Sequence, residues 1–249
     1  MKKLLSLATA LVLGGSLLYG GGHGAHWGYT GQTGPEHWGD LSKDFEMCKL
    51  GKNQSPVDLR TDTAYKTDKA PIIFSYTAST DNEVNNGHSI QVNIKHGSFI
   101  QIDGMKFNLK QFHFHTPSEN TIDGRYFPME AHFVHVDDAG NIAVVAVMFK
   151  YGKTNEALQR FWDKMPADEG AKRYINESAK VVTALLPKKR DYYRFNGSLT
   201  TPPCSEGVRW FVMKEPLEVS KEQVAQFEKV MGGPNNRPVQ PFNARMLLK

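Results

Sequence analysis

The chain has 249 residues, of which 40% are hydrophobic and 22% are charged, and its formal net charge is +4 at pH 7. These values are ordinary for a soluble globular protein, and a chain of this length can bury a substantial core as one domain. The small net charge, with no basic stripe among aromatic residues, argues against nucleic acid as a partner.

The N-terminal segment has the pattern of a secretory signal peptide. Lys2 and Lys3 precede an apolar run from Leu4 to Leu18, as in exported proteins. The run is shorter than the roughly 20 residues that a membrane-spanning helix needs, and no cysteine directly follows it to carry a lipid anchor. We therefore expect residues 1–20 to be a signal peptide, with its cleavage position open. The mature protein, residues 21–249, would be periplasmic or secreted and have no stable membrane anchor.

The sequence contains two cysteines, Cys48 and Cys204. An even count in an exported domain favours a disulfide, and two buried free thiols are the alternative. Closing a loop of this length would stabilise the fold by at most on the order of 5 kcal/mol.

Between the signal segment and the C-terminus, the pattern predicts mainly strands. The segment from Trp27 to Trp38 is aromatic but rich in glycine, so we expect an irregular flap. From Ile72 to Tyr151, short β-branched and aromatic runs alternate with turn residues, which is typical of consecutive antiparallel strands. The run from Ile142 to Phe149 is apolar on both faces, so we expect it in the middle of a sheet.

Two helices are predicted after these strands. The first follows Thr154 and carries a core-facing apolar stripe of Leu158, Phe161, Trp162 and Met165. The second begins at Ser220, with Gln223 completing a capping box, and ends at the glycines 232–233. The predicted fold is a single, mainly β domain (class α+β). Its large twisted sheet is mostly antiparallel and has a few peripheral helices.

Three histidines suggest a metal site. His113 and His115 are two residues apart, so in a strand both side chains project to the same face. Turn residues within 116–131 allow the chain to fold back and place His132 beside them. Three nitrogen ligands with one open position are typical of catalytic zinc. Packed or solvated histidines are the alternative interpretation of this pattern.

Neighbouring polar residues favour the metal interpretation. Gln111 lies two residues before His113, and Glu130 lies two residues before His132, each on the same strand face as its histidine. Metal-bound histidines almost always donate their second N–H group to such a partner. His135 falls on the opposite face of its strand, and we expect it to be structural.

The motifs of this chain resemble those of the alpha-class carbonic anhydrases, in particular the exported bacterial branch. Five motifs occur in the family's order: Asn53-Gln54-Ser55-Pro56, Asn86-Gly87-His88, Gln111-Phe112-His113-Phe114-His115, Glu130-Ala131-His132 and Gly197-Ser198-Leu199-Thr200-Thr201-Pro202-Pro203. The resemblance spans nearly the whole mature chain, residues 26–240. It implies reversible, zinc-dependent hydration of carbon dioxide to bicarbonate and a proton, within a twisted sheet of about ten strands. The expected partners are small molecules, and the oligomeric state stays open, a homodimer included.

The resemblance also assigns roles. It implies that His113, His115 and His132 bind Zn²⁺. Gln111, Glu130 and a backbone carbonyl, that of Asn235, would orient the three ligands.

The same resemblance assigns the chemical step and the proton transfer. Thr200 would accept a hydrogen bond from zinc-bound hydroxide while it donates its own proton to Glu119, and His88 would be the proton shuttle. Many animal members have a longer, tryptophan-containing segment after the second histidine, whereas this chain has Thr116-Pro117-Ser118 before Glu119. A substrate pocket would be formed by Val134, Val144, Leu199, Thr201, Val208 and Trp210.

Parts of this pattern also fit two other classes, a cupin-type metal enzyme and a non-catalytic binding module. His113-x-His115-x-x-x-Glu119 also satisfies the metal motif of cupins, which are double-sheet jelly rolls. The cupin glycine and Pro-x-Gly segments are missing, however, and residues 197–203 would be unexplained. A zincin protease would need His-Glu-x-x-His, which is absent. A non-catalytic binding module on the same fold is the second alternative, typical of members that have lost a zinc histidine.

Overall fold

The computed structural model describes residues 25–249, so the signal peptide expected at residues 1–20 lies outside the described part. The strands are β1 (Asp58–Leu59), β2 (Ile73–Ser75), β3 (Thr80–Asn85), β4 (Ile90–Ile94), β5 (Phe99–Ile102), β6 (Met105–His115), β7 (Thr121–Ile122), β8 (Met129–Val136), β9 (Ile142–Tyr151), β10 (Lys172–Tyr174), β11 (Tyr192–Ser198), β12 (Glu206–Met213) and β13 (Leu217–Val219). The helices are η1 (Gly31–Thr33), α1 (Trp38–Leu41), η2 (Lys43–Phe45), α2 (Met47–Leu50), α3 (Glu156–Trp162), α4 (Ala179–Ala184) and α5 (Lys221–Met231). Among these helices, none is long and apolar enough to cross a membrane.

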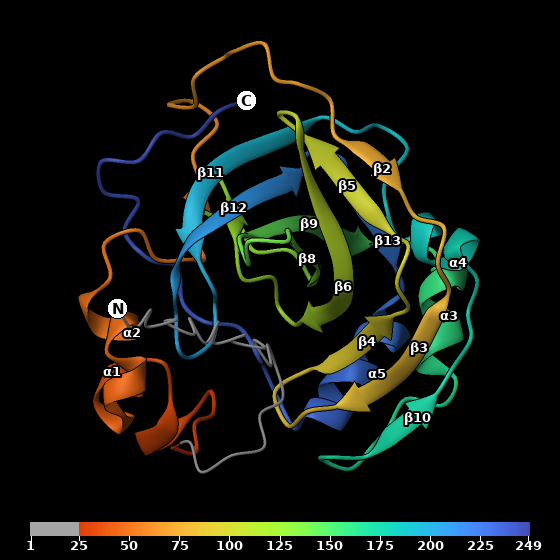
Figure 1. Ribbon diagram of the computed structural model, residues 1–249. Helices are drawn as coiled ribbons and strands as arrows, with labels where there is room; N and C mark the ends of the chain where they lie inside the picture. Colours follow the sequence, from red (N-terminus) through yellow and green to blue (C-terminus); the bar gives the residue numbers. More distant parts are fainter. Residues whose placement is uncertain (1–24) are drawn as a thin grey trace, which may run out of the picture.

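One 11-stranded sheet forms the body of the molecule, in the order β10-β3-β4-β6-β8-β9-β12-β11, with β2, β5 and β13 attached to it. The sheet curves around the central strands β6, β8 and β9 (Figure 1). The prediction of a mainly β fold with one mostly antiparallel sheet is confirmed. The parallel pairs in this sheet are β9 with β12 and β9 with β13. Parallel strands need a long crossover connection, and the chain between β9 and β12 includes α3 and α4.

Strand β9 lies in the middle of the sheet, as its apolar sequence predicted. Its side chains alternate between two cores. Val145 and Val147 join the larger core cluster, which also contains Phe161 and Trp162 of α3. The even-numbered residues 144, 146 and 148 join the smaller core cluster, on the other face, with Trp210 of β12. A strand buried on both faces can be apolar at every position.

The helices fall into two groups. Figure 1 shows α3, α4 and α5 beside β3, β4 and β10, with α1 and α2 in a separate part of the view. Helix α5 has the predicted capping box of Ser220 and Gln223, and it ends at Gly232 in the left-handed conformation. Helix α3 ends at Trp162, so Met165 of the predicted stripe lies beyond it. Pro166 directly follows Met165, and helical geometry is disfavoured for a residue that precedes a proline.

The predicted disulfide is present between Cys48 and Cys204. It joins α2, in the N-terminal segment, to the loop between β11 and β12 across a sequence separation of 156 residues. No free cysteine occurs in the described chain.

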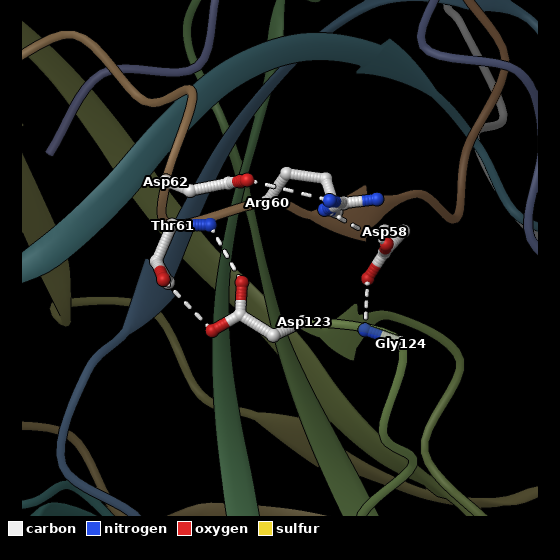
Figure 2. Close-up of a pocket in the computed structure, with 6 residues that line it drawn as sticks. All are labelled: Asp58, Arg60, Thr61, Asp62, Asp123 and Gly124. Atoms are coloured by element: carbon white, nitrogen blue, oxygen red, sulfur yellow. Dashed lines mark hydrogen bonds and ion pairs between the residues drawn. The ribbon is translucent and has the colours of Figure 1, made fainter.

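A surface hollow lies where β1 and β7 pair in parallel (Figure 2). Asp123 accepts hydrogen bonds from the backbone N–H and the hydroxyl of Thr61, each at 2.7 Å. Asp58 accepts a hydrogen bond from the backbone N–H of Gly124, also at 2.7 Å. These hydrogen bonds connect the segment of β1 to the turn after β7.

Candidate metal centre

Adjacent strands bring the three histidines together. His113 and His115 lie on β6, and His132 on β8 is the direct cross-strand partner of His113. The ring centroids are 4.7 to 5.3 Å apart. One potential ligand atom from each ring lies within 4.8 Å of the other two, and this is the one such group of metal-binding side chains found among residues 25–249. Strand alternation and antiparallel register are therefore sufficient to assemble the cluster.

Each histidine is oriented through one ring nitrogen. Nδ1 of His113 lies 2.8 Å from Oε1 of Gln111, and Nδ1 of His115 lies 2.8 Å from the backbone carbonyl oxygen of Asn235. Nε2 of His132 faces Oε1 of Glu130 at 3.0 Å.

The remaining nitrogens fit a metal ion. Nε2 of His115 is buried and has no hydrogen-bond partner within the described chain. A buried polar atom without a partner is costly, and a metal ion would satisfy it. Burial also lowers the pKa of His113 and of His132 well below the usual value, reinforced by the neighbouring His115. Neutral imidazoles at pH 7 are the form that binds zinc, so the donor set fits this ion.

Glu119 lies beside the histidines and is fully buried. Its Oε1 accepts a hydrogen bond of 2.9 Å from the backbone N–H of Arg237. Its Oε2 is 3.5 Å from Nε2 of His115. Burial raises the pKa of Glu119 to about 8, while hydrogen bonds from the Arg237 backbone and the Thr200 side chain act to lower it. The structure thus brings Thr200 and Glu119 together next to the histidine cluster.

Glu130 is held by a partner that the sequence analysis missed. Its Oε2 accepts hydrogen bonds from the backbone N–H groups of Glu119 and Asn120, at 2.7 and 2.8 Å. The side-chain amide of Asn120 donates to Oε1 at 2.7 Å. Asn120 directly follows Glu119 in the chain, but nothing in its sequence environment indicates a contact with β8.

His88 lies in the turn between β3 and β4. Its backbone N–H donates to Oδ1 of Asn86 at 3.0 Å, and its backbone carbonyl accepts from the side chain of Asn235 at 2.9 Å. The ring stacks on Trp27, with centroids 3.5 Å apart and planes 10° from parallel. Burial lowers the pKa of His88 to about 4, Glu169 acts to raise it, and His26 acts to lower it.

The comparisons with known proteins identify the family. The family model of the eukaryotic-type carbonic anhydrases matches residues 33–249. The chain belongs to the alpha-carbonic anhydrase family. It is 47% identical to a carbonic anhydrase of Neisseria gonorrhoeae over 252 residues, covering 100% of this chain and 98% of the relative. It is 44% identical to one of Pectobacterium carotovorum over 242 residues, covering 97% and 98%.

A solved structure supports the same conclusion. The alpha-carbonic anhydrase from Thermovibrio ammonificans, in complex with the inhibitor sulfanilamide, is similar to this chain with a TM-score of 0.88 and 54% identity. The likeness covers 91% of this chain and 100% of the other. The protein is therefore a zinc enzyme that hydrates carbon dioxide reversibly.

The apolar residues expected to line the substrate pocket of this carbonic anhydrase come together on one face of the sheet. Val134, Val144, Val208 and Trp210 belong to the smaller core cluster, and Leu199 packs against it. The ring of Trp210 lies 4.9 Å from that of His132, which places this apolar surface next to the histidines. Thr201, by contrast, is half-buried in the loop after β11.

Proposed function

We propose that His113, His115 and His132 hold the zinc ion and that carbon dioxide reacts with water beside them. The observation that carries this proposal is the unpartnered Nε2 of buried His115, in a cluster of three neutral imidazoles. When bound, zinc supplies a positive charge that lowers the pKa of its water to about 7, a value that describes carbonic anhydrases in general. The three polar partners each occupy one ring nitrogen, so the other nitrogen of each ring would face the ion.

Thr200 and Glu119 orient the attacking oxygen. If the Thr200 hydroxyl donates its hydrogen bond to the carboxylate of Glu119, it has no proton left to donate. Toward the substrate, the Thr200 oxygen can then only accept a hydrogen bond. An attacking O–H group must then point its proton at Thr200 and direct a lone pair at the carbon, which is catalysis by orientation. A cation among the histidines favours the charged form of Glu119, because an opposite charge nearby lowers the pKa of a carboxyl group.

The apolar surface next to the histidines holds the substrate. Carbon dioxide has no net charge and no dipole, so Val134, Val144, Leu199, Val208 and Trp210, with the half-buried Thr201 beside them, can accommodate it without hydrogen bonds. Bicarbonate is an anion, and its transfer from water into an apolar environment is unfavourable. The same wall therefore favours substrate entry and product release.

His88 transfers the proton between the site and solvent. In the stacked position its pKa of about 4 leaves the ring mostly neutral at pH 7. Loss of the stacking contact with Trp27 returns the ring to solvent, where the usual pKa near 6.5 allows it to accept and release a proton. We propose that the ring moves between these positions during turnover.

The structure and the comparisons disfavour the two alternative functions, a cupin-type enzyme and a non-catalytic binding module. A cupin is excluded, because the chain belongs to another family whose fold it shares. A non-catalytic module would be typical of a chain without its zinc histidines, and here the three meet at ligand distance.

We also propose that residues 1–20 direct export and that the mature domain, residues 21–249, works in the periplasm or outside the cell. The disulfide between Cys48 and Cys204 supports an oxidising compartment. Cell fractionation with N-terminal sequencing of the mature protein tests both points, and a full-length cytoplasmic protein would contradict them. Analytical ultracentrifugation of the mature form measures whether it is a monomer or a homodimer.

The decisive experiment combines metal analysis with activity. The purified mature protein should contain one zinc per chain and hydrate carbon dioxide in a stopped-flow assay. Sulfanilamide, which is bound to the Thermovibrio enzyme, should abolish that activity. Chelation should remove both zinc and activity, and added zinc should restore them. Full activity in zinc-free protein would overturn the proposal.

A further inference from the structure

The motif Asn53-Gln54-Ser55-Pro56 has no part in the proposed chemistry, and neither has the guanidinium group of Arg237. We propose that Gln54, Ser55 and Arg237 form a positioning bracket that sets the placement of Thr200 relative to Glu119. They are positioning residues for the hydration step, since they act through the loop of Thr200 and through Glu119. The inference rests on the roles proposed for Thr200 and Glu119.

One end of the bracket holds the loop of Thr200 on both flanks. The backbone N–H of Ser55 donates to Oγ of Ser198 at 2.8 Å, and the backbone N–H of Ser198 donates to Oγ of Ser55 at 3.1 Å. Ser198 lies two residues before Thr200. Four residues after Thr200, the carbonyl oxygen of Cys204 accepts from Nε2 of Gln54 at 3.0 Å. The loop is thus fixed to residues 54 and 55 at its start and at its end.

The close approach of Ser55 to strand β11 depends on a glycine, Gly197. A Cβ atom at Gly197 would lie 2.1 Å from Oγ of Ser55, far inside van der Waals contact. The family motif that begins at Gly197 therefore includes the residue that allows Ser55 to reach Ser198.

The other end of the bracket holds Glu119. The side chain of Arg237 is buried, with 1% of the residue surface exposed. Its Nη1 donates to Oε1 of Gln54 at 2.9 Å and to the carbonyl oxygen of Ser55 at 2.8 Å, and its Nη2 donates to the carbonyl oxygen of Cys48 at 3.0 Å. The backbone N–H of the same residue donates to Oε1 of Glu119 at 2.9 Å.

The path from Thr200 to Glu119 is therefore continuous. Gln54 uses its N–H group on the Thr200 loop and its oxygen on Arg237, and Arg237 contacts the carboxylate of Glu119. The disulfide closes the same assembly, because both of its cysteines supply a carbonyl acceptor to the bracket. Catalysis by orientation is sensitive to displacements of about 1 Å, which can lower a rate by about 100-fold.

The test is the kinetics of Gln54→Leu, which removes the three side-chain hydrogen bonds of Gln54, with Cys204, Glu206 and Arg237, without a large change in volume. We expect kcat/KM for carbon dioxide to fall by roughly tenfold, because Thr200 is displaced. The zinc content should stay at one per chain, and kcat should change less, since it depends on proton transfer through His88. In a Thr200→Ala background, Gln54→Leu should have less than about a twofold further effect, because residues acting as a unit are non-additive.

Two further variants keep the result interpretable. Gln223→Leu removes another buried glutamine, in α5, whose side chain is hydrogen-bonded to Ser220, Asn155 and Gln159 and to none of the site residues. It should lower the melting temperature and leave kcat/KM unchanged. Ser55→Ala removes the bond to Ser198 N–H and should show the same selective loss in kcat/KM, of roughly threefold; it provides the test if Gln54→Leu does not fold.

The outcomes separate the two proposals. If Thr200→Ala lowers kcat/KM but Gln54→Leu and Ser55→Ala do not, the bracket is only structural. An equal fractional loss from Gln54→Leu with and without Thr200 would also overturn the bracket. If Thr200→Ala leaves kcat/KM unchanged, the proposed role of Thr200 fails first, and the bracket fails with it.

Discussion

The histidine cluster and the turn of His88 hold the same side chain in opposite ways. In the cluster, each ring has one nitrogen against a fixed polar partner, such as the Asn235 carbonyl for His115. At His88 the structure fixes the backbone, through Asn86 and Asn235, while the ring has a stacking contact with Trp27. Asn235 serves both regions, since its carbonyl orients a cluster histidine and its amide anchors the turn.

The difference fits the two functions proposed for this residue type. A metal ligand must keep one tautomer and one orientation, which hydrogen bonds to the second nitrogen provide. A proton carrier must instead change its protonation state and its surroundings, and a stacked ring on a fixed backbone can do so by rotation alone. Substitutions in the two regions should therefore change different properties: zinc content and activity in the cluster, and kcat alone at His88.

The largest effect is expected in the cluster. Replacing a single member, as in His115→Ala, should remove nearly all bound zinc and activity, because two imidazoles cannot replace the three-ligand set. His113→Ala and His132→Ala should behave alike. Metal analysis and stopped-flow hydration provide the measurement, and the exposed His96 supplies the control His96→Ala, which should keep both. Full activity with retained zinc in any cluster variant would remove that residue from the ligand set.

The partner of a ligand should matter less than the ligand. Glu130→Gln keeps the shape but replaces the carboxylate that faces Nε2 of His132 and accepts three hydrogen bonds from Glu119 and Asn120. Zinc affinity should fall by about 10- to 100-fold, measured by competition with a chelator. An unchanged affinity would show that Glu130 only supports the backbone of residues 119–120.

His88→Ala should separate the two regions kinetically. Loss of the proposed proton carrier should lower kcat by roughly 10- to 100-fold in weak buffer, while kcat/KM stays nearly unchanged, because the hydration step as proposed does not use this group. Added imidazole should restore part of kcat. Equal losses in both parameters, or no rescue at any imidazole concentration, would assign His88 a structural role.

The smallest effect is expected from Trp27→Ala. Without the stacked indole, the pKa of His88 should rise from about 4 toward 6.5, which NMR titration of the ring protons measures. The depressed pKa in the folded parent means that His88 reduces stability as the pH falls from 6.5 through 4, since only the unfolded chain takes up the proton there. This acid dependence should become shallower in the variant. An unchanged titration would mean that other groups bury the ring.

Much of the fold was predictable because it depends on local pattern. The apolar run from Ile142 to Phe149 predicted a central strand, and the capping box at Ser220 predicted the start of a helix; both are confirmed. The short helices α1, α2 and α4 were not predicted, since segments of four to six residues show too few turns for helical periodicity. The parallel pairing of β9 with β12 also has no local signal, because it depends on where the chain returns.

The candidate site can be divided in the same way, into features that follow from the local sequence pattern and features that depend on tertiary structure. Strand alternation by itself placed His113 and His115 on one face and Gln111 beside them, because the two-residue period of a strand is a property of the backbone. The contacts of Arg237 with Gln54 and of Trp27 with His88 were decided by tertiary structure alone. These residues are separated by more than 180 and more than 60 positions in the chain. Which of these distant residues come into contact depends on how their segments pack against the sheet. The local periodicity of the sequence contains no signal for such contacts.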